Sequence, residues 1–149
     1  MPALFIIAHA PLASAFHSAA GHVFAEFEDN LACYDVRADA SDTDSQAEAA
    51  VALASLGDRP VLILTDVFGG TPCNVALRLA QPIEARVAVG INLAMLWRAI
   101  TYREKPLDEL LELALAGARM GVMQASVSRP QNQANKPLRH DPNQSDDQQ

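Results

Sequence analysis

The stretch ALFIIA occupies residues 3–8 and leads directly into His9. Six apolar residues in a row, with no charge among them, are typical of a strand that is buried on both faces of a sheet. The stretch PVLILT at residues 60–65 has the same character and leads directly into Asp66. These two runs predict central strands of a parallel sheet, and they decide the fold class.

Weaker patterns around these two runs predict the remaining elements. Pro11 and Pro72 suit first helical turns, Ser41 or Asp42 can cap a helix, and Gly57 is a helix-end signal. The expected strands span residues 31–36 and 85–90, with a short final strand at 121–128, and the expected helices span residues 12–27, 44–56, 72–80, 92–102 and 106–119. Strands that alternate with helices require crossover connections. We therefore predict an α/β fold in three layers, α/β/α, with a mainly parallel sheet of strand order 2-1-3-4.

Composition excludes several classes of function. Half of the 149 residues are apolar but only 5% are aromatic, which suits helices packed on a sheet better than a surface that stacks nucleic-acid bases. The formal net charge of −7 makes DNA, RNA and anionic membranes poor partners. The two cysteines, Cys33 and Cys73, form no C-x-x-C pair and fit a reducing compartment.

The two ends of the chain differ in character. The apolar start has no Lys or Arg before it and no stretch long enough to span a bilayer, so we expect neither a signal peptide nor membrane insertion, but a cytoplasmic protein. Residues 129–149 are rich in Gln, Asn, Asp and Pro and lack apolar periodicity. We expect one domain over residues 1–128 and a disordered polar tail over residues 129–149, because the tail cannot bury enough surface to offset its ordering entropy.

Two loops with reactive groups are expected to meet at one edge of the sheet. In an open parallel sheet, ligands bind beyond the carboxyl ends of the strands, where the strand order reverses. The order 2-1-3-4 places the first and third strands side by side, so His9 would meet the loop at residues 66–72. A neutral imidazole is a nucleophile near neutral pH. Asp66 can accept a hydrogen bond from its other ring nitrogen and stabilise the cation that develops during attack.

The same loop has the features of an anion site. Gly69 and Gly70 allow backbone N–H groups to approach an anion closely, and Thr71 offers a hydroxyl. The helix expected to open at Pro72 points its positive end at the same place. Together with His9, these residues predict a phosphate-binding loop that faces a nucleophile and requires no metal or other cofactor.

Three motifs, in this order and spacing, resemble the mannose-family IIA component of the bacterial sugar phosphotransferase system, in its fructose subfamily. They are IIAH at residues 6–9, DVFGGTP at 66–72 and GINLAML at 90–96. The resemblance implies a protein-histidine phosphotransferase that carries phosphoryl as phosphohistidine during sugar transport. His9 would accept phosphoryl from the phosphocarrier protein HPr and pass it to a IIB protein, Asp66 would hydrogen-bond His9, and Gly70 and Thr71 would surround the phosphoryl oxygens.

The resemblance also implies a homodimer whose last strand, here residues 122–127, is exchanged between subunits. The chain departs from the family next to the histidine. Ala8 stands where a small hydroxyl residue is usual and Ala10 where glycine is usual, and Phe68 replaces a common tryptophan. These departures concern partner preference more than the phosphoryl site.

Two other functions fit the same residues. A stand-alone regulatory protein would carry the same phosphohistidine and signal the state of the phosphotransferase system without sugar transport. A module of a different class would bind a phosphate ester on the glycine loop and form no phosphohistidine. An acyl hydrolase is disfavoured because no serine lies in a G-x-S-x-G pattern.

The remaining candidate residues have structural interpretations. His17 and His22 lie five positions apart on an expected helix, so they face different directions and do not suit a shared metal ion. Cys33 and Cys73 are expected to pack in the interior. The acidic residues between positions 39 and 44 suit a loop and a helix cap, since they lack the glycine and terminal glutamate of an EF-hand.

Overall fold

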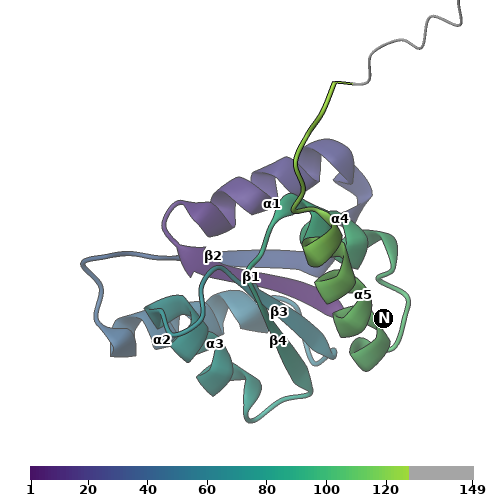
Figure 1. The fold of residues 1–149 in the computed structure, drawn as a ribbon. Helices are drawn as coiled ribbons and strands as arrows, with labels where there is room; N and C mark the ends of the chain where they lie inside the picture. The colour runs from purple at the N-terminus through teal and green to yellow at the C-terminus, as the bar shows by residue number, and fades with distance from the viewer. Residues whose placement is uncertain (128–149) are drawn as a thin grey trace, which may run out of the picture.

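The computed structural model describes residues 1–127 as a four-stranded parallel sheet covered by helices (Figure 1). The strands are β1 (Ala3–His9), β2 (Leu31–Val36), β3 (Val61–Thr65) and β4 (Ala85–Val89), in the order β2-β1-β3-β4. The helices are α1 (Leu12–Val23), α2 (Asp42–Ala54), α3 (Thr71–Ala80), α4 (Leu93–Thr101) and α5 (Leu107–Met120), with a 3-10 helix, η1 (Ala25–Asn30), between α1 and β2. The predicted fold class and strand order are confirmed. None of the helices in this part of the chain is long and apolar enough to cross a membrane.

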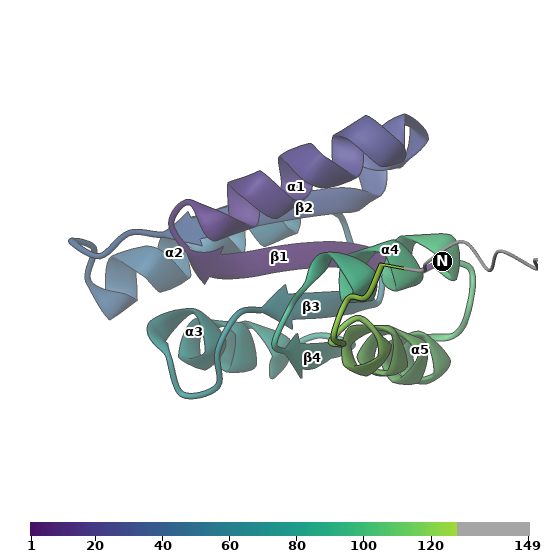
Figure 2. The same ribbon diagram turned by 45° about the horizontal axis from the view of Figure 1, so that its top comes forward.

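Alternation along β1 divides the core into two layers. Helices α1, α4 and α5 cover one face of the sheet, and α2 and α3 cover the other (Figures 1 and 2). Leu4, Ile6 and Ala8 pack with the first group of helices, whereas Ala3, Phe5 and Ile7 pack with the second. Each of these six side chains is fully buried. A strand that is apolar at every position must be covered on both faces, which explains why the helices divide into two layers around this sheet.

The helix expected at residues 12–27 is shorter than predicted. It ends at Val23, where Phe24 leaves the helical region with φ −130° and ψ 58°, and η1 follows. The turn allows Phe24 to pack edge-on against Trp97, with ring centroids 6.0 Å apart, and it buries Phe27 beneath the guanidinium of Arg103. Packing between the Phe24 and Trp97 rings therefore ends the helix early, and its last residue, Val23, is exposed.

The start of α2 is set by a side-chain cap. Ser41 Oγ accepts a hydrogen bond from the Asp44 backbone N–H at 3.0 Å, and α2 begins at Asp42, two residues before the expected start. Asp42 and Asp44 then lie in the first turn, where negative charge suits the helix dipole. The acidic residues of this loop thus have a structural role as a cap and a first turn.

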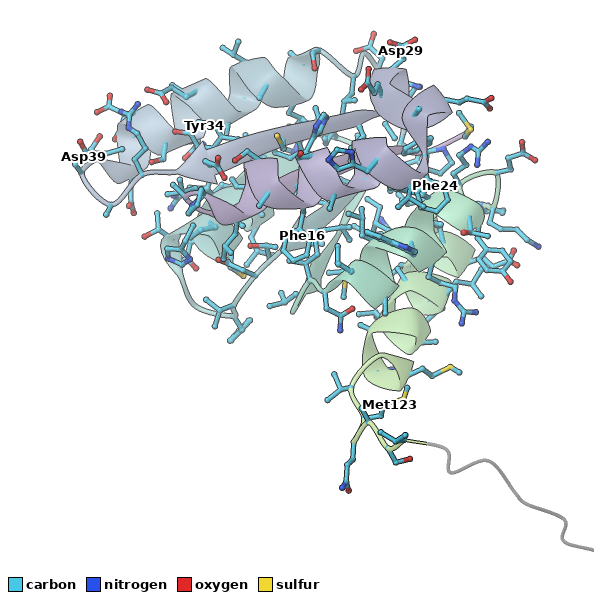
Figure 3. The ribbon with its side chains drawn as sticks, turned by 90° about the horizontal axis from the view of Figure 1, so that it is seen from above. Phe16, Phe24, Asp29, Tyr34, Asp39 and Met123 are labelled. Carbon is cyan, nitrogen blue, oxygen red and sulfur yellow. The ribbon has the colours of Figure 1, made fainter. Side chains whose placement is uncertain are left out.

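The stretch after α5 forms no strand within the single chain. Residues 122–127 have no regular structure and are exposed, and Figure 3 shows Met123 on the segment that runs away from α5. Of the final strand expected at residues 121–128, the described residues 121–127 therefore form no strand, and β4 is the edge of the sheet within residues 1–127. The tail predicted at residues 129–149 lies outside the described residues.

Two helical glycines provide a test of the packing. A Cβ at Gly21, in α1, would approach no atom more closely than 3.7 Å, whereas a Cβ at Gly117, in α5, would lie 2.8 Å from Arg98 Cβ. We expect Gly21→Ala to stabilise the protein by about 0.5–1 kcal/mol, since alanine favours a helix without a clash. Gly117→Ala should destabilise it by about 1–3 kcal/mol through overpacking. Urea unfolding followed by circular dichroism measures both changes, and equal signs for the two variants would contradict the packing of α4 on α5.

Candidate functional site

The candidate site lies at the carboxyl ends of β1 and β3, beside the loop that leads into α3 (Figure 2). The two strands pair in parallel, with Ile7 opposite Thr65. His9, the last residue of β1, and Asp66, the first residue after β3, are therefore neighbours although they are 57 positions apart in the sequence. The pairing of central strands places the two predicted residues together.

His9 and Asp66 are joined by two hydrogen bonds to one carboxylate oxygen. Asp66 Oδ2 lies 2.7 Å from His9 Nδ1 and accepts the His9 backbone N–H at 3.0 Å. The other oxygen, Oδ1, accepts the Val67 backbone N–H at 2.9 Å. An ionised carboxylate only accepts hydrogen bonds, so Nδ1 must carry the proton and a neutral ring has its lone pair on Nε2.

The environment keeps Asp66 ionised. Burial is the largest single influence on this carboxyl and by itself would raise its pKa. The hydrogen bonds from the His9 backbone, the His9 ring and the Val67 backbone together outweigh burial, so the pKa of Asp66 lies below its ordinary value. The Asp66 side chain is 12% exposed and the His9 side chain 49% exposed, so the carboxylate is largely buried whereas the imidazole is accessible to solvent.

The glycine loop fits closely against the ring. A Cβ at Gly70 would lie 3.0 Å from His9 Cε1 and 3.2 Å from Val67 Cγ1, so a side chain at this position would press on the imidazole. Gly69 has φ +82°, a conformation that favours glycine. Gly70 is the N-cap of α3, and the helix geometry leaves the N–H groups of Thr71 and Cys73 without partners inside the helix. An anion beside His9 would meet these donors and the positive end of α3.

Val67 and Phe68 form an exposed apolar rim on the loop that follows Asp66, a feature that was not predicted from the sequence. Phe68 is 80% exposed and Val67 51% exposed, and both belong to the same loop as Asp66. The sequence feature that could have indicated this rim is the presence of two apolar residues inside an otherwise polar, glycine-containing loop. Large apolar side chains held in water next to a reactive group are typical of a surface that receives another protein.

The other candidate residues have no part in this site. His17 is half-buried, and its Nε2 lies 3.3 Å from the Leu31 carbonyl oxygen. Burial, with a smaller contribution from Asp35, raises the pKa of Cys33, which disfavours its thiolate, and Cys73 is buried. Over residues 1–127, no three His, Cys, Asp or Glu side chains are grouped so as to hold a metal ion.

The fold and the site define a class of protein: an α/β/α domain that presents an accessible histidine, hydrogen-bonded to a carboxylate, at the carboxyl edge of a parallel sheet. Within this class, the chain belongs to the mannose-type IIA family of the sugar phosphotransferase system, since the family model described as "EIIA-man: PTS system fructose IIA component" matches residues 3–115. The predicted family is confirmed, and the protein is a phosphoryl-carrier component of that system.

Solved structures agree with this assignment. The mannose/sorbose specific IIA subunit of the phosphotransferase system from Enterococcus faecalis is 28% identical, with a TM-score of 0.78, over 86% of this chain and 97% of that chain. Phosphotransferase system component EIIA from Streptococcus agalactiae, at 24% identity, covers 83% of this chain and 97% of its own, with a TM-score of 0.73. The PTS IIA protein associated with the fucose utilization operon from Streptococcus pneumoniae, at 21% identity, covers 83% and 92%, with a TM-score of 0.70. The last two show the fold alone, and the comparison with curated proteins gave no match.

The carboxylate can be tested by titration. We expect the titration midpoint of Asp66, followed by its side-chain ¹³C carboxyl signal, to lie below the ordinary aspartate value of about 3.9. The stability contributed by its hydrogen bonds is then fully present above that pH and is lost as the pH falls through the lowered pKa. His9→Ala removes the ring but keeps the backbone donor, so the titration midpoint of Asp66 in this variant should rise part of the way toward the ordinary aspartate value. A midpoint at or above 3.9 in the unaltered protein would mean that burial outweighs the hydrogen bonds.

Proposed function

We propose that His9 Nε2 accepts the phosphoryl group from phospho-HPr and passes it to a IIB protein. The observation that carries this proposal is the contact of Asp66 Oδ2 with His9 Nδ1, because it leaves the lone pair of a neutral ring on Nε2. The Nε2 lone pair forms a bond to phosphorus as the bond between phosphorus and the donor histidine of HPr breaks. The ring becomes cationic in this step, and the Asp66 carboxylate stabilises the positive charge.

The glycine loop supports the second requirement of the reaction, which is stabilisation of the phosphoryl oxygens. Gly69 and Thr71 offer backbone N–H groups, and Thr71 also a hydroxyl, in the loop at the positive end of α3. Gly70 lies closest to the ring, and its own N–H donates to the Val67 carbonyl oxygen at 3.4 Å. The negative charge that moves between donor and acceptor would be held by these dipoles without a metal ion.

Membership of the family implies that the chain interacts with HPr and a IIB component. In this proposal, the apolar rim of Val67 and Phe68 receives both partners in turn. The His9 ring is half exposed, so a second protein can reach it without opening the fold. Ala8 is buried and Ala10 exposed, so of the two departures beside the histidine only Ala10 lies where a partner can contact it.

Incubation with phosphoenolpyruvate, enzyme I and HPr tests the phosphoryl site. Intact mass should show one acid-labile phosphoryl adduct on the unaltered protein and none on His9→Ala. Asp66→Ala should keep the fold and label roughly tenfold or more slowly, because the ring loses its orienting partner. The matched control is His22→Ala, an exposed histidine of α1 that should label at the normal rate.

Each result bears on a separate part of the proposal. Absence of an adduct on the unaltered protein with competent HPr would overturn the carrier function of His9. Normal labelling of Asp66→Ala would show that the carboxylate has no orienting role. Transfer onward to a IIB protein distinguishes transport from the regulatory alternative, in which the phosphorylated protein would donate to no IIB.

We further infer that the protein is a homodimer in which residues 122–127 pair with the edge strand β4 of a second copy. Two observations support this: β4 is an edge strand in the described part of the chain, and Val122, Met123 and Val127 are 78%, 75% and 92% exposed. An unpaired strand edge and an exposed apolar segment are both unfavourable in water, and pairing them removes both costs.

Single charges in the segment test this dimer. Val122→Asp and Met123→Asp should convert the protein to a monomer or raise the dimer dissociation constant at least tenfold, as measured by sedimentation velocity. Val51→Asp is the matched control, since Val51 is 75% exposed on α2 and lies outside the segment. A dimer unaffected by both changes in the segment, or a monomer in the unaltered protein, would contradict the exchange.

A further inference from the structure

The GINLAML segment at residues 90–96 contacts the structure at two places that the phosphoryl chemistry does not explain. Its first two N–H groups, from Gly90 and Ile91, both donate to the Thr65 carbonyl oxygen, at 2.9 and 3.0 Å. Thr65 is buried and immediately precedes Asp66. The turn after β4 is thus anchored one residue away from the carboxylate that holds His9.

Asn92 connects this turn to both helices that follow. Its Oδ1 accepts the Met95 backbone N–H at 2.8 Å and caps the start of α4, and its Nδ2 donates to the Ala118 carbonyl at 3.1 Å, near the end of α5. The Ala118 carbonyl also accepts the Gly121 backbone N–H, so the Asn92 amide is a second donor to this oxygen in the last turn of α5. One side chain therefore joins the start of α4 to the end of α5.

Close packing reinforces the same junction. A Cβ at Gly121 would lie 2.5 Å from Ala94 Cβ, so the end of α5 rests directly on the first turn of α4. Ala118 O also accepts the Gly121 backbone N–H at 3.2 Å, and residues 122–127 leave α5 at this point. The direction in which residues 122–127 leave α5 is thus set at the Ala118 carbonyl, to which Asn92 donates its hydrogen bond.

We propose that Asn92 is a positioning residue that joins the Asp66–His9 pair, through the turn at Gly90 and Ile91, to the end of α5. Asn92 touches no reacting atom. It acts by holding the turn against the Thr65 carbonyl, and its loss would loosen both the support of Asp66 and the exit of residues 122–127. Side chains that support the residues of a site in this way commonly determine how well the site is oriented.

Asn92→Asp separates the two hydrogen bonds of this side chain. A carboxylate can still accept the Met95 N–H, but it cannot donate to Ala118 and would face the carbonyl oxygen with a negative charge. Amide hydrogen exchange of the full, unphosphorylated chain should accelerate roughly five- to tenfold at Gly90, Ile91 and Gly121, the change expected when one hydrogen bond is lost, and stay close to normal at Met95. Ile63, in the centre of β3, serves as the internal reference for global unfolding.

The second measurement is the ¹⁵N spectrum of the His9 ring. If Asn92 acted only at the end of α5, its substitution would not alter this spectrum. We expect both ring nitrogen signals to shift in Asn92→Asp. The matched control is Ser41→Ala, which removes the equivalent cap of α2 and should leave the His9 signals and the exchange at Gly90 and Gly121 unchanged. With phospho-HPr, Asn92→Asp should lower kcat severalfold without changing KM, since the proposal assigns Asn92 to the orientation of His9 and not to contact with the partner.

Two outcomes would overturn the proposal. Exchange at Gly90 and Gly121 within twofold of normal would show that Asn92 does not hold the turn. Faster exchange with unchanged His9 signals would show that the junction does not reach the site. Only the kcat measurement rests on the proposed function of His9. If His9 did not take up phosphoryl, hydrogen exchange and the ¹⁵N signals of the His9 ring would still decide the role of Asn92.

Discussion

The parallel pairing of β1 with β3 is the contact that creates the site. Phe5 lies opposite Ile63 and Ile7 opposite Thr65, so the carboxyl ends of the two strands emerge side by side. Nothing in the local sequence around His9 or Asp66 would bring them together. Their 2.7 Å contact exists because the two most apolar strands occupy the centre of the sheet, where burial on both faces fixes their neighbours and their register.

This dependence explains how much of the site could be predicted from the sequence. The runs at residues 3–8 and 60–65 identify central strands by composition alone, and the rule for open parallel sheets then places His9 beside Asp66. The sequence analysis also assigned Gly69 and Gly70 to this loop, but the tight fit at position 70, where a Cβ would lie 3.0 Å from His9 Cε1, is visible only in the structure. Residue patterns thus predict which groups meet, because strand order and register depend on burial that the sequence displays directly.

The features that could not be predicted depend on contacts between distant parts of the chain. The early end of α1 is caused by Phe24 packing on Trp97, and the periodicity of residues 12–27 contains no sign of that partner. The junction at Asn92 needs the end of α5 to lie on the start of α4, which is a matter of helix packing. The proposed pairing of residues 122–127 would depend on a surface outside the single chain, since no strand of residues 1–127 pairs with the outer edge of β4.

Electrostatics present a further constraint on the proposed function, because a chain of net charge −7 would accept a negatively charged phosphoryl group next to an ionised aspartate. The arrangement of donors resolves this difficulty. Three N–H groups, from the His9 backbone, the His9 ring and the Val67 backbone, converge on the Asp66 carboxylate, so its charge is already compensated locally. At physiological salt, charges beyond about 8 Å are largely screened, and the field that phosphoryl meets is set by the nearest dipoles. Those are the N–H groups of the glycine loop and the first turn of α3, which favour an anion. In the proposed transfer, the Asp66 carboxylate would therefore act on phosphoryl through the imidazole, where its negative charge would stabilise the cation that phosphorylation creates.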